Sequence, residues 1–171
     1  VRTPEHDELG AEKTAKLLER IIGRQKVREG AVKLVAQHMK PLQFWQNKSG
    51  EKAFKRLAVK LHPETDLELL ATLAQADYRG TNPHGDRPHG KDSEMVEWFR
   101  EMIRASHVER EPESPVLMGR HLLDHMVPGP RMGEVLEEAY RIQLDEGVTD
   151  RDELRRRAMA NCGVDNSGAE D

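Results

Sequence analysis

The chain contains little cysteine and few aromatic residues, and it has no long apolar run. Cys162 is its single cysteine, so an intramolecular disulfide and a cysteine-based zinc site are both excluded. This usage fits a reducing compartment, and we expect a cytoplasmic protein. No apolar run approaches the roughly 20 residues that a membrane-spanning helix needs. We therefore expect no membrane partner.

Three Phe, two Trp and two Tyr are too few aromatic residues to form most of a core in a chain of 171 residues. The core must consist mainly of Leu, Ile, Val, Ala and Met. Strands favour aromatic and β-branched side chains, whereas helices tolerate Leu, Ala, Met, Glu, Lys and Arg. The composition therefore predicts an all-α fold.

The net charge of −4 is not typical of a nucleic-acid-binding protein as a whole. The distribution is uneven, because residues 26–60 hold nine basic side chains against two acidic ones, whereas the C-terminal tail is acidic. The basic segment could attract a polyanion. A solvated helix face is the alternative interpretation.

The spacing of apolar residues predicts eight helices, near residues 4–22, 25–39, 50–61, 66–77, 93–106, 118–126, 132–146 and 149–160. Pro41 is expected to stop the second helix, which leaves Phe44 and Trp45 in a short connector. Ser49 is a candidate cap of the third helix. Thr65 and Glu68 have the spacing of a capping box at the start of the fourth.

The domain organisation follows from the composition between these helices. We expect a helical domain at 1–108 with a long loop at 80–92, a linker at 109–115, a smaller helical unit at 116–162 and a disordered tail at 163–171.

Three residues of the first half lie beside apolar helix positions and could point into one interhelical space: His6, His38 and Asp77. Imidazole and carboxylate ligands together suit a divalent transition metal. Spacing alone does not separate such a site from solvated or structural histidines.

The segments that carry these residues resemble HD-family phosphohydrolase domains. Residues 4–11 (PEHDELGA) resemble the segment where a histidine opens a helix, residues 34–41 (LVAQHMKP) the next histidine-bearing helix, and residues 73–80 (LAQADYRG) the closing aspartate segment. The resemblance implies an HD-like metal site of His6, His38 and Asp77. The family also uses an earlier histidine and a His-Asp dyad on upstream helices, which this chain lacks, so we expect weak metal binding or none.

The second half is similar to the C-terminal part of bacterial tRNA nucleotidyltransferases (CCA-adding enzymes) and poly(A) polymerases. The similar segments are residues 115–123 (PVLMGRHLL), 128–136 (PGPRMGEVL) and 139–147 (AYRIQLDEG). The combined resemblance implies an HD-like helical bundle followed by a smaller helical C-terminal unit. In the parent enzyme a separate N-terminal head would bind Mg²⁺, ATP and CTP and extend the tRNA 3′ end. Nothing in this chain matches that head, so no catalytic residue is expected here.

The remaining role that the resemblance implies is to position tRNA through its phosphates. The candidate contacts are Lys52, Lys55 and Arg56 in the basic segment, and Gly129, Arg131 and Gly133 around a helix start whose free amides could hold a phosphate. A tight helix–helix turn is the alternative for the second group. Two other functions stay open: a metal-dependent phosphohydrolase using His6, His38 and Asp77, and a structural or dimerising module.

Overall fold

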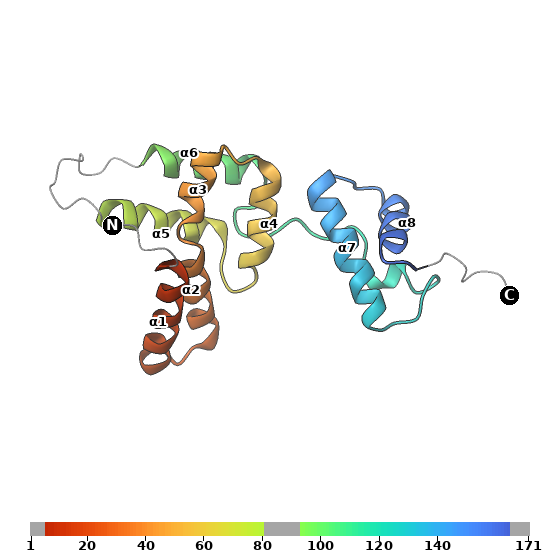
Figure 1. Cartoon of the computed structure of the whole chain (residues 1–171), viewed down its shortest axis with the longest axis horizontal. Coiled ribbons are helices and arrows are strands. Elements are labelled where there is room, and N and C mark those ends of the chain that lie inside the picture. Colours follow the sequence, from red (N-terminus) through yellow and green to blue (C-terminus); the bar gives the residue numbers. More distant parts are fainter. Residues whose placement is uncertain (1–5, 81–92, 165–171) are drawn as a thin grey trace. The chain divides into compact units, whose positions relative to one another are not determined.

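The chain is all-helical in the part that the structure describes, as its composition predicts. The structure is a computed structural model that describes residues 6–80 and 93–164, with residues 6–8 described by their backbone alone. These ranges contain eight α-helices, one 3-10 helix and no strand. None of the described helices is both long enough and apolar enough to cross a membrane. The chain divides into two compact units, Val1–Pro112 and Glu113–Asp171 (Figure 1).

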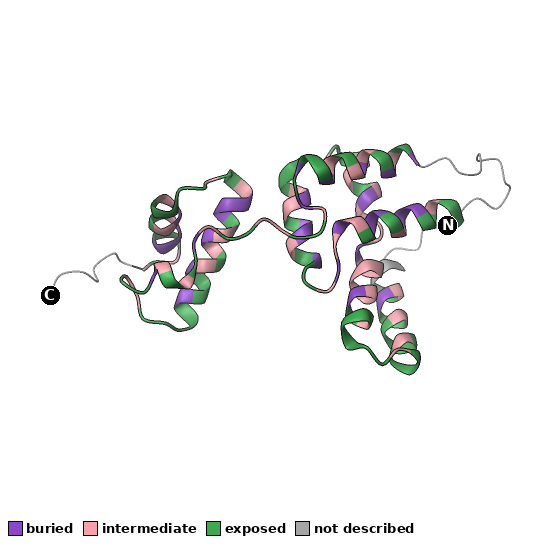
Figure 2. Ribbon diagram, turned by 180° about the vertical axis from the view of Figure 1, so that it is seen from behind, coloured by how far each residue is buried: buried purple, intermediate pink, exposed green. Residues whose placement is uncertain are grey.

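The described residues of the first unit form six helices: α1 (His6–Ile21), α2 (Gln25–Gln37), α3 (Lys40–Asn47), α4 (Glu51–Leu61), α5 (Leu67–Gly80) and α6 (Glu94–Ala105). Helices α1 and α2 pack as a hairpin, and α2 in turn contacts α4 and α5. Helix α6 packs against α3, α4 and α5. The core among α3–α6 includes Phe54, Leu61, Leu70, Phe99 and Ile103, which lie on the buried faces of their helices (Figure 2).

The prediction of a short connector after Pro41 is wrong, because these residues form helix α3. Pro41 occupies the first turn of α3, where its missing N–H costs nothing because that amide has no intrahelical acceptor. The proline therefore begins a new helix instead of only ending the previous one. As a result Phe44 packs edge-on against Phe54, with ring centroids 5.1 Å apart.

Two predicted caps were also wrong. Gly50, not Ser49, is the N-cap residue of α4, and its backbone is extended. At the start of α5, the Asp66 carboxylate accepts the Leu69 amide at 2.8 Å. The Thr65 hydroxyl is buried and has no hydrogen-bond partner among the described residues.

Helix α2 approaches the turn after α4 very closely at Gly30. A Cβ built on Gly30 would lie 2.6 Å from the Glu64 carbonyl oxygen, so only glycine fits without a shift. Beside this contact, Lys33 forms an ion pair with the Glu64 carboxylate. This close contact and the ion pair beside it help to hold the hairpin against the rest of the first unit.

The second unit contains a 3-10 helix, η1 (Gly119–His121), and the helices α7 (Pro130–Glu146) and α8 (Arg151–Asn161). In place of the helix predicted near 118–126, the structure has a 3-10 helix of one turn, followed by hydrogen-bonded turns. Such short runs are typical of 3-10 helices. Helix α7 starts at Pro130, two residues earlier than predicted. Its contact with α8 and η1 encloses a separate core that includes Leu122, Val135, Ile142, Leu154 and Ala158.

The unit boundary after Pro112 falls within residues 109–115. Most of the predicted loop at 80–92 and of the predicted disordered tail lies outside the described residues, which omit 81–92 and 165–171.

Candidate nucleic-acid interface

Helix α4 carries a stripe of cations on the face opposite its buried side. Lys52, Arg56 and Lys60 are exposed and recur at every fourth position, which places them on one helix face. On the other face, Phe54 and Leu61 are fully buried in the first core. The amphipathic pattern of α4 therefore fixes which way its cations point. We call Lys52, Arg56 and Lys60 the α4 stripe.

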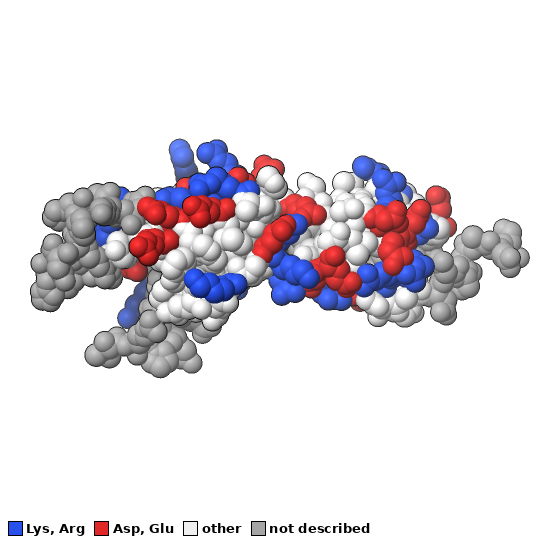
Figure 3. Space-filling view, turned by 90° about the horizontal axis from the view of Figure 1, so that it is seen from above, with Lys and Arg blue, Asp and Glu red and all other residues white. Residues whose placement is uncertain are grey.

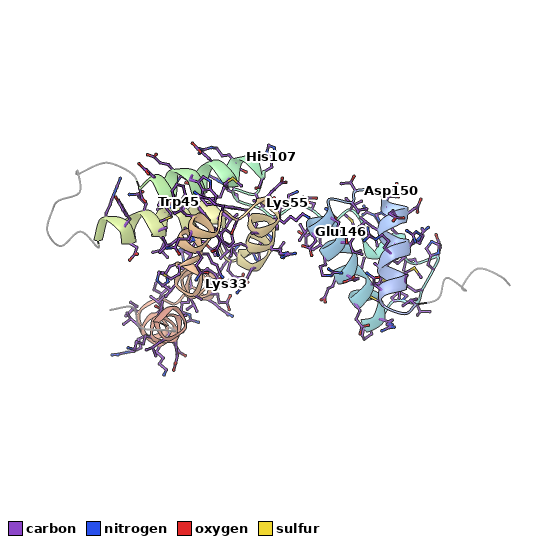
Figure 4. All side chains as sticks on the ribbon, turned by 45° about the horizontal axis from the view of Figure 1, so that its top comes forward. Lys33, Trp45, Lys55, His107, Glu146 and Asp150 are labelled. Carbon is purple, nitrogen blue, oxygen red and sulfur yellow. The ribbon has the colours of Figure 1, made fainter. Side chains whose placement is uncertain are left out.

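Lys55 lies on the same helix (Figure 4), but it is partly buried whereas the stripe residues are exposed. Its side chain is 18% exposed, and its ammonium lies 2.8 Å from the Glu51 carboxylate one turn earlier. Such pairs on a helix surface contribute little stability, about 0.3–0.5 kcal/mol, but they neutralise charge locally. Lys55 is therefore a weaker candidate for a phosphate contact than Lys52.

Sequence reasoning missed Lys60. Lys52, Lys55 and Arg56 were predicted together because they are close in the sequence. The cations that are exposed are instead those spaced four residues apart along the helix. Counting in steps of four from Lys52 would have identified Lys60 and separated it from Lys55.

An aromatic cluster lies beside α4 and includes both tryptophans. Trp45 of α3 meets Trp98 of α6 edge-on at 5.5 Å, and Trp98 also contacts Phe54 at 5.8 Å. The Lys48 ammonium lies 4.1 Å from the centroid of the Trp45 ring. These contacts show that the tryptophans pack against other side chains of the first unit.

The second predicted contact region, at the start of α7, belongs to the second unit. Gly129 is the N-cap residue, and no side chain among the described residues caps this end. Gly129, Arg131 and Gly133 are all exposed. The Arg131 guanidinium lies 2.7 Å from the Glu134 carboxylate and also donates to the Cys162 carbonyl oxygen. The charge of Arg131 is thus partly balanced within the unit.

Helix α8 uses its run of three arginines for ion pairs. Arg155 lies 3.0 Å from Asp152, Arg156 lies 2.7 Å from Glu153, and Arg157 lies 2.6 Å from Glu146 of α7. Lys, Arg, Asp and Glu side chains intermingle on the face shown in Figure 3. The α8 arginines therefore need no external anion to balance them.

The three HD-like residues have different surroundings. His38 follows α2 and is half-buried, and its Nδ1 atom lies 2.6 Å from the Val35 carbonyl oxygen. Asp77 is exposed near the end of α5. The side chain of His6 lies outside the described residues. No group of three His, Cys, Asp or Glu side chains within the described part is arranged to hold a metal, so the convergence of His6, His38 and Asp77 stays a prediction.

A cavity of about 470 Å³ opens between α1 and α2, and sequence reasoning did not anticipate it. Ala15 and Val32 contribute its apolar lining, and the ionic side chains around it include Glu19, Arg28 and Lys33. The lining surface is mainly apolar, and the charged side chains around it carry both signs, a combination that favours no particular ligand class.

Comparison with known proteins adds no further constraint. No protein-family model matches the chain, and no curated protein or solved structure does. The functional interpretation therefore depends on the residues and on their placement.

Proposed function

We propose that this chain is the tRNA-positioning C-terminal portion of a tRNA nucleotidyltransferase, and that it holds tRNA through phosphate contacts. Two features support the proposal. Segments of the first half resemble HD-family domains and segments of the second half resemble the C-terminal part of tRNA nucleotidyltransferases, a combination that implies this family. The α4 stripe offers exposed cations in a row. The stripe carries the proposal, because a line of cations suits a phosphate backbone without reading its sequence.

The charge pattern sets the expected strength of binding. The net charge of −4 opposes association with RNA, and Arg131 is already paired. We expect a dissociation constant no better than roughly micromolar, with no preference among tRNA sequences. Affinity should fall steeply with salt, because each phosphate contact releases counterions.

The test is a fluorescence titration of labelled tRNA at several salt concentrations. Replacing both Lys52 and Lys60 by alanine should weaken all tRNAs alike and reduce the salt slope by about two units, one for each cation. The matched control replaces Lys13 and Arg104 by alanine, which removes the same charge from exposed positions on α1 and α6. Arg131→Ala should have a smaller effect than either stripe lysine.

Absence of binding at low salt would reject the proposal. Equal effects of the stripe variant and its control would also reject it, because they would show attraction by overall charge without a defined contact. The structural-module interpretation would then be preferred.

The HD-like residues are proposed to be catalytically silent. No histidine precedes His6 in the sequence, and the context of His6 and Asp7 resembles the later histidine of the family and not its His-Asp dyad. His6, His38 and Asp77 should therefore bind manganese weakly or not at all. We expect no metal-stimulated hydrolysis of a model phosphodiester. Hydrolysis that His38→Ala abolishes would instead support the phosphohydrolase alternative.

A further inference from the structure

The segment that joins the two units is anchored to the first unit as far as Glu109. Val108 is 1% exposed and belongs to the first core. One residue later, the Glu109 carbonyl oxygen accepts the Glu68 amide of α5 at 3.3 Å. The chain therefore leaves the first unit only after Glu109.

The same segment is anchored to the second unit from Glu113 onward, and a buried glutamine makes most of the contacts. Gln143 of α7 is 1% exposed. Its Oε1 atom accepts the Val116 amide at 2.9 Å, and its Nε2 atom donates to the Ser114 carbonyl oxygen at 2.9 Å and to a Glu113 carboxylate oxygen at 2.7 Å. The Tyr140 hydroxyl donates to the Glu113 carbonyl oxygen.

These contacts use the full donor capacity of the Gln143 side-chain amide. A buried amide left without partners would cost more than its hydrogen bonds contribute, so Gln143 and residues 113–116 stabilise each other. Leu117, 3% exposed in the second core, continues the attachment directly afterwards. Residues 113–117 therefore pack with α7, although residues 113–115 belong to the linker that the sequence predicts.

We propose that Gln143, with Tyr140, acts as a positioning residue that confines flexing between the two units to residues 110–112. Within the described part of the chain, no hydrogen bond ties Arg110, Glu111 or Pro112 to either unit. Pro112 has a fixed φ and restricts the residue before it, so few backbone dihedrals remain free. The inference concerns the covalent connection and holds whether or not the chain binds tRNA.

The experiment is backbone NMR on the full chain. The ¹⁵N heteronuclear NOE should be low at Arg110 and Glu111, and it should match the α7 average at Ser114 and Val116. Hydrogen exchange of the Val116 amide should be slow, because its acceptor is the buried Gln143 side chain. Low NOE values at Ser114 and Val116 would overturn the inference.

Gln143→Leu keeps the side-chain volume and removes all three hydrogen bonds. It should speed Val116 exchange about tenfold or more, and it should lower the NOE at Ser114 to that of Glu111. Gln43→Leu, at an exposed position of α3, is the matched control and should change neither. Unchanged exchange at Val116 in Gln143→Leu would also overturn the inference.

A milder variant covers the case in which Gln143→Leu does not fold. Tyr140→Phe removes one donor and leaves Gln143 in place. It should lower the NOE at Glu113 while Val116 exchange stays slow. An unchanged NOE at Glu113 would count against the proposed contribution of Tyr140.

Discussion

Glu138 has the most perturbed carboxylate among the described residues for which a pKa shift is resolved. Two guanidinium nitrogens of Arg141 lie 2.6 and 2.7 Å from its oxygens, and the Asn161 amide donates to it at 2.7 Å. The Arg141 hydrogen bonds, followed by that of Asn161, lower the pKa of Glu138 from 4.5 to about 2. Because Asn161 ends α8, this carboxylate links the two helices of the second unit.

The lowered pKa predicts a pH-dependent effect of Glu138→Gln. A depressed pKa stabilises the fold above pH 4.5, and this contribution is lost as the pH falls toward 2. Arg141 is 55% exposed, so solvent screens the pair, and we expect the variant to lose about 1–2 kcal/mol of unfolding free energy at pH 7. Urea denaturation from pH 7 to pH 2 measures this loss.

The neighbouring exposed residue provides the control for Glu138. Glu137→Gln removes the same charge one position earlier and should have little effect at any pH. A difference between wild type and Glu138→Gln that stays constant from pH 7 to pH 2 would contradict the assigned electrostatic role.

The candidate contact residues show what the sequence can predict at this scale. The excess of basic residues in 26–60 pointed to the region that contains α4. The helical period then determines which cations of α4 are exposed. Hydrogen bonds between residues far apart in the sequence could not be predicted, because Arg131 donates to the Cys162 carbonyl oxygen 31 residues away. That contact depends on how α7 packs against the end of α8, which no local pattern specifies.

At the scale of the elements, two adjacent residues, Thr65 and Asp66, are candidates for the N-cap of α5. The sequence favours Thr65, whereas in the structure Asp66 caps the helix. Asp66→Ala should therefore cost about 1 kcal/mol of unfolding free energy. Thr65→Val should be neutral or stabilising, because it replaces a buried hydroxyl that lacks a partner among the described residues.

Chemical denaturation of both single variants measures the difference. The two positions are adjacent, so each variant serves as the control for the other. A larger loss for Thr65→Val than for Asp66→Ala would restore the capping box that the sequence suggested.

Most helices could be predicted from the spacing of apolar residues and from the glycine and proline residues that separate the helices. Gly23 lies between α1 and α2, and Pro63 lies two residues after Leu61, where α4 ends, as expected from their backbone preferences. Pro41 was ambiguous, because proline is unfavourable inside a helix and favourable in its first turn. Packing of Phe44 against the first core accompanies the second outcome.

At the scale of the whole molecule, two separate cores predict two separable stabilities. Phe99 is fully buried in the first core and Leu154 in the second. Phe99→Ala should lower the stability of the first unit by about 3–5 kcal/mol and leave the second almost unchanged. Residue-resolved amide signals during urea denaturation measure both units in one sample.

Leu154→Ala provides the reciprocal variant and should lower the stability of the second unit by about 2–5 kcal/mol. If either substitution shifts the transitions of both units equally, the cores are energetically coupled and the prediction fails.

The pairing of Trp45 with Trp98 has a spectroscopic consequence. These are the two tryptophans of the chain, and both belong to the first unit. Light that only tryptophan absorbs therefore excites the first unit alone. We expect the emission to respond to the position of the Lys48 ammonium, which lies beside the Trp45 ring. A ligand that contacts α3 or the adjoining start of α4 should alter this emission, whereas a ligand confined to α7 and α8 should leave it unchanged.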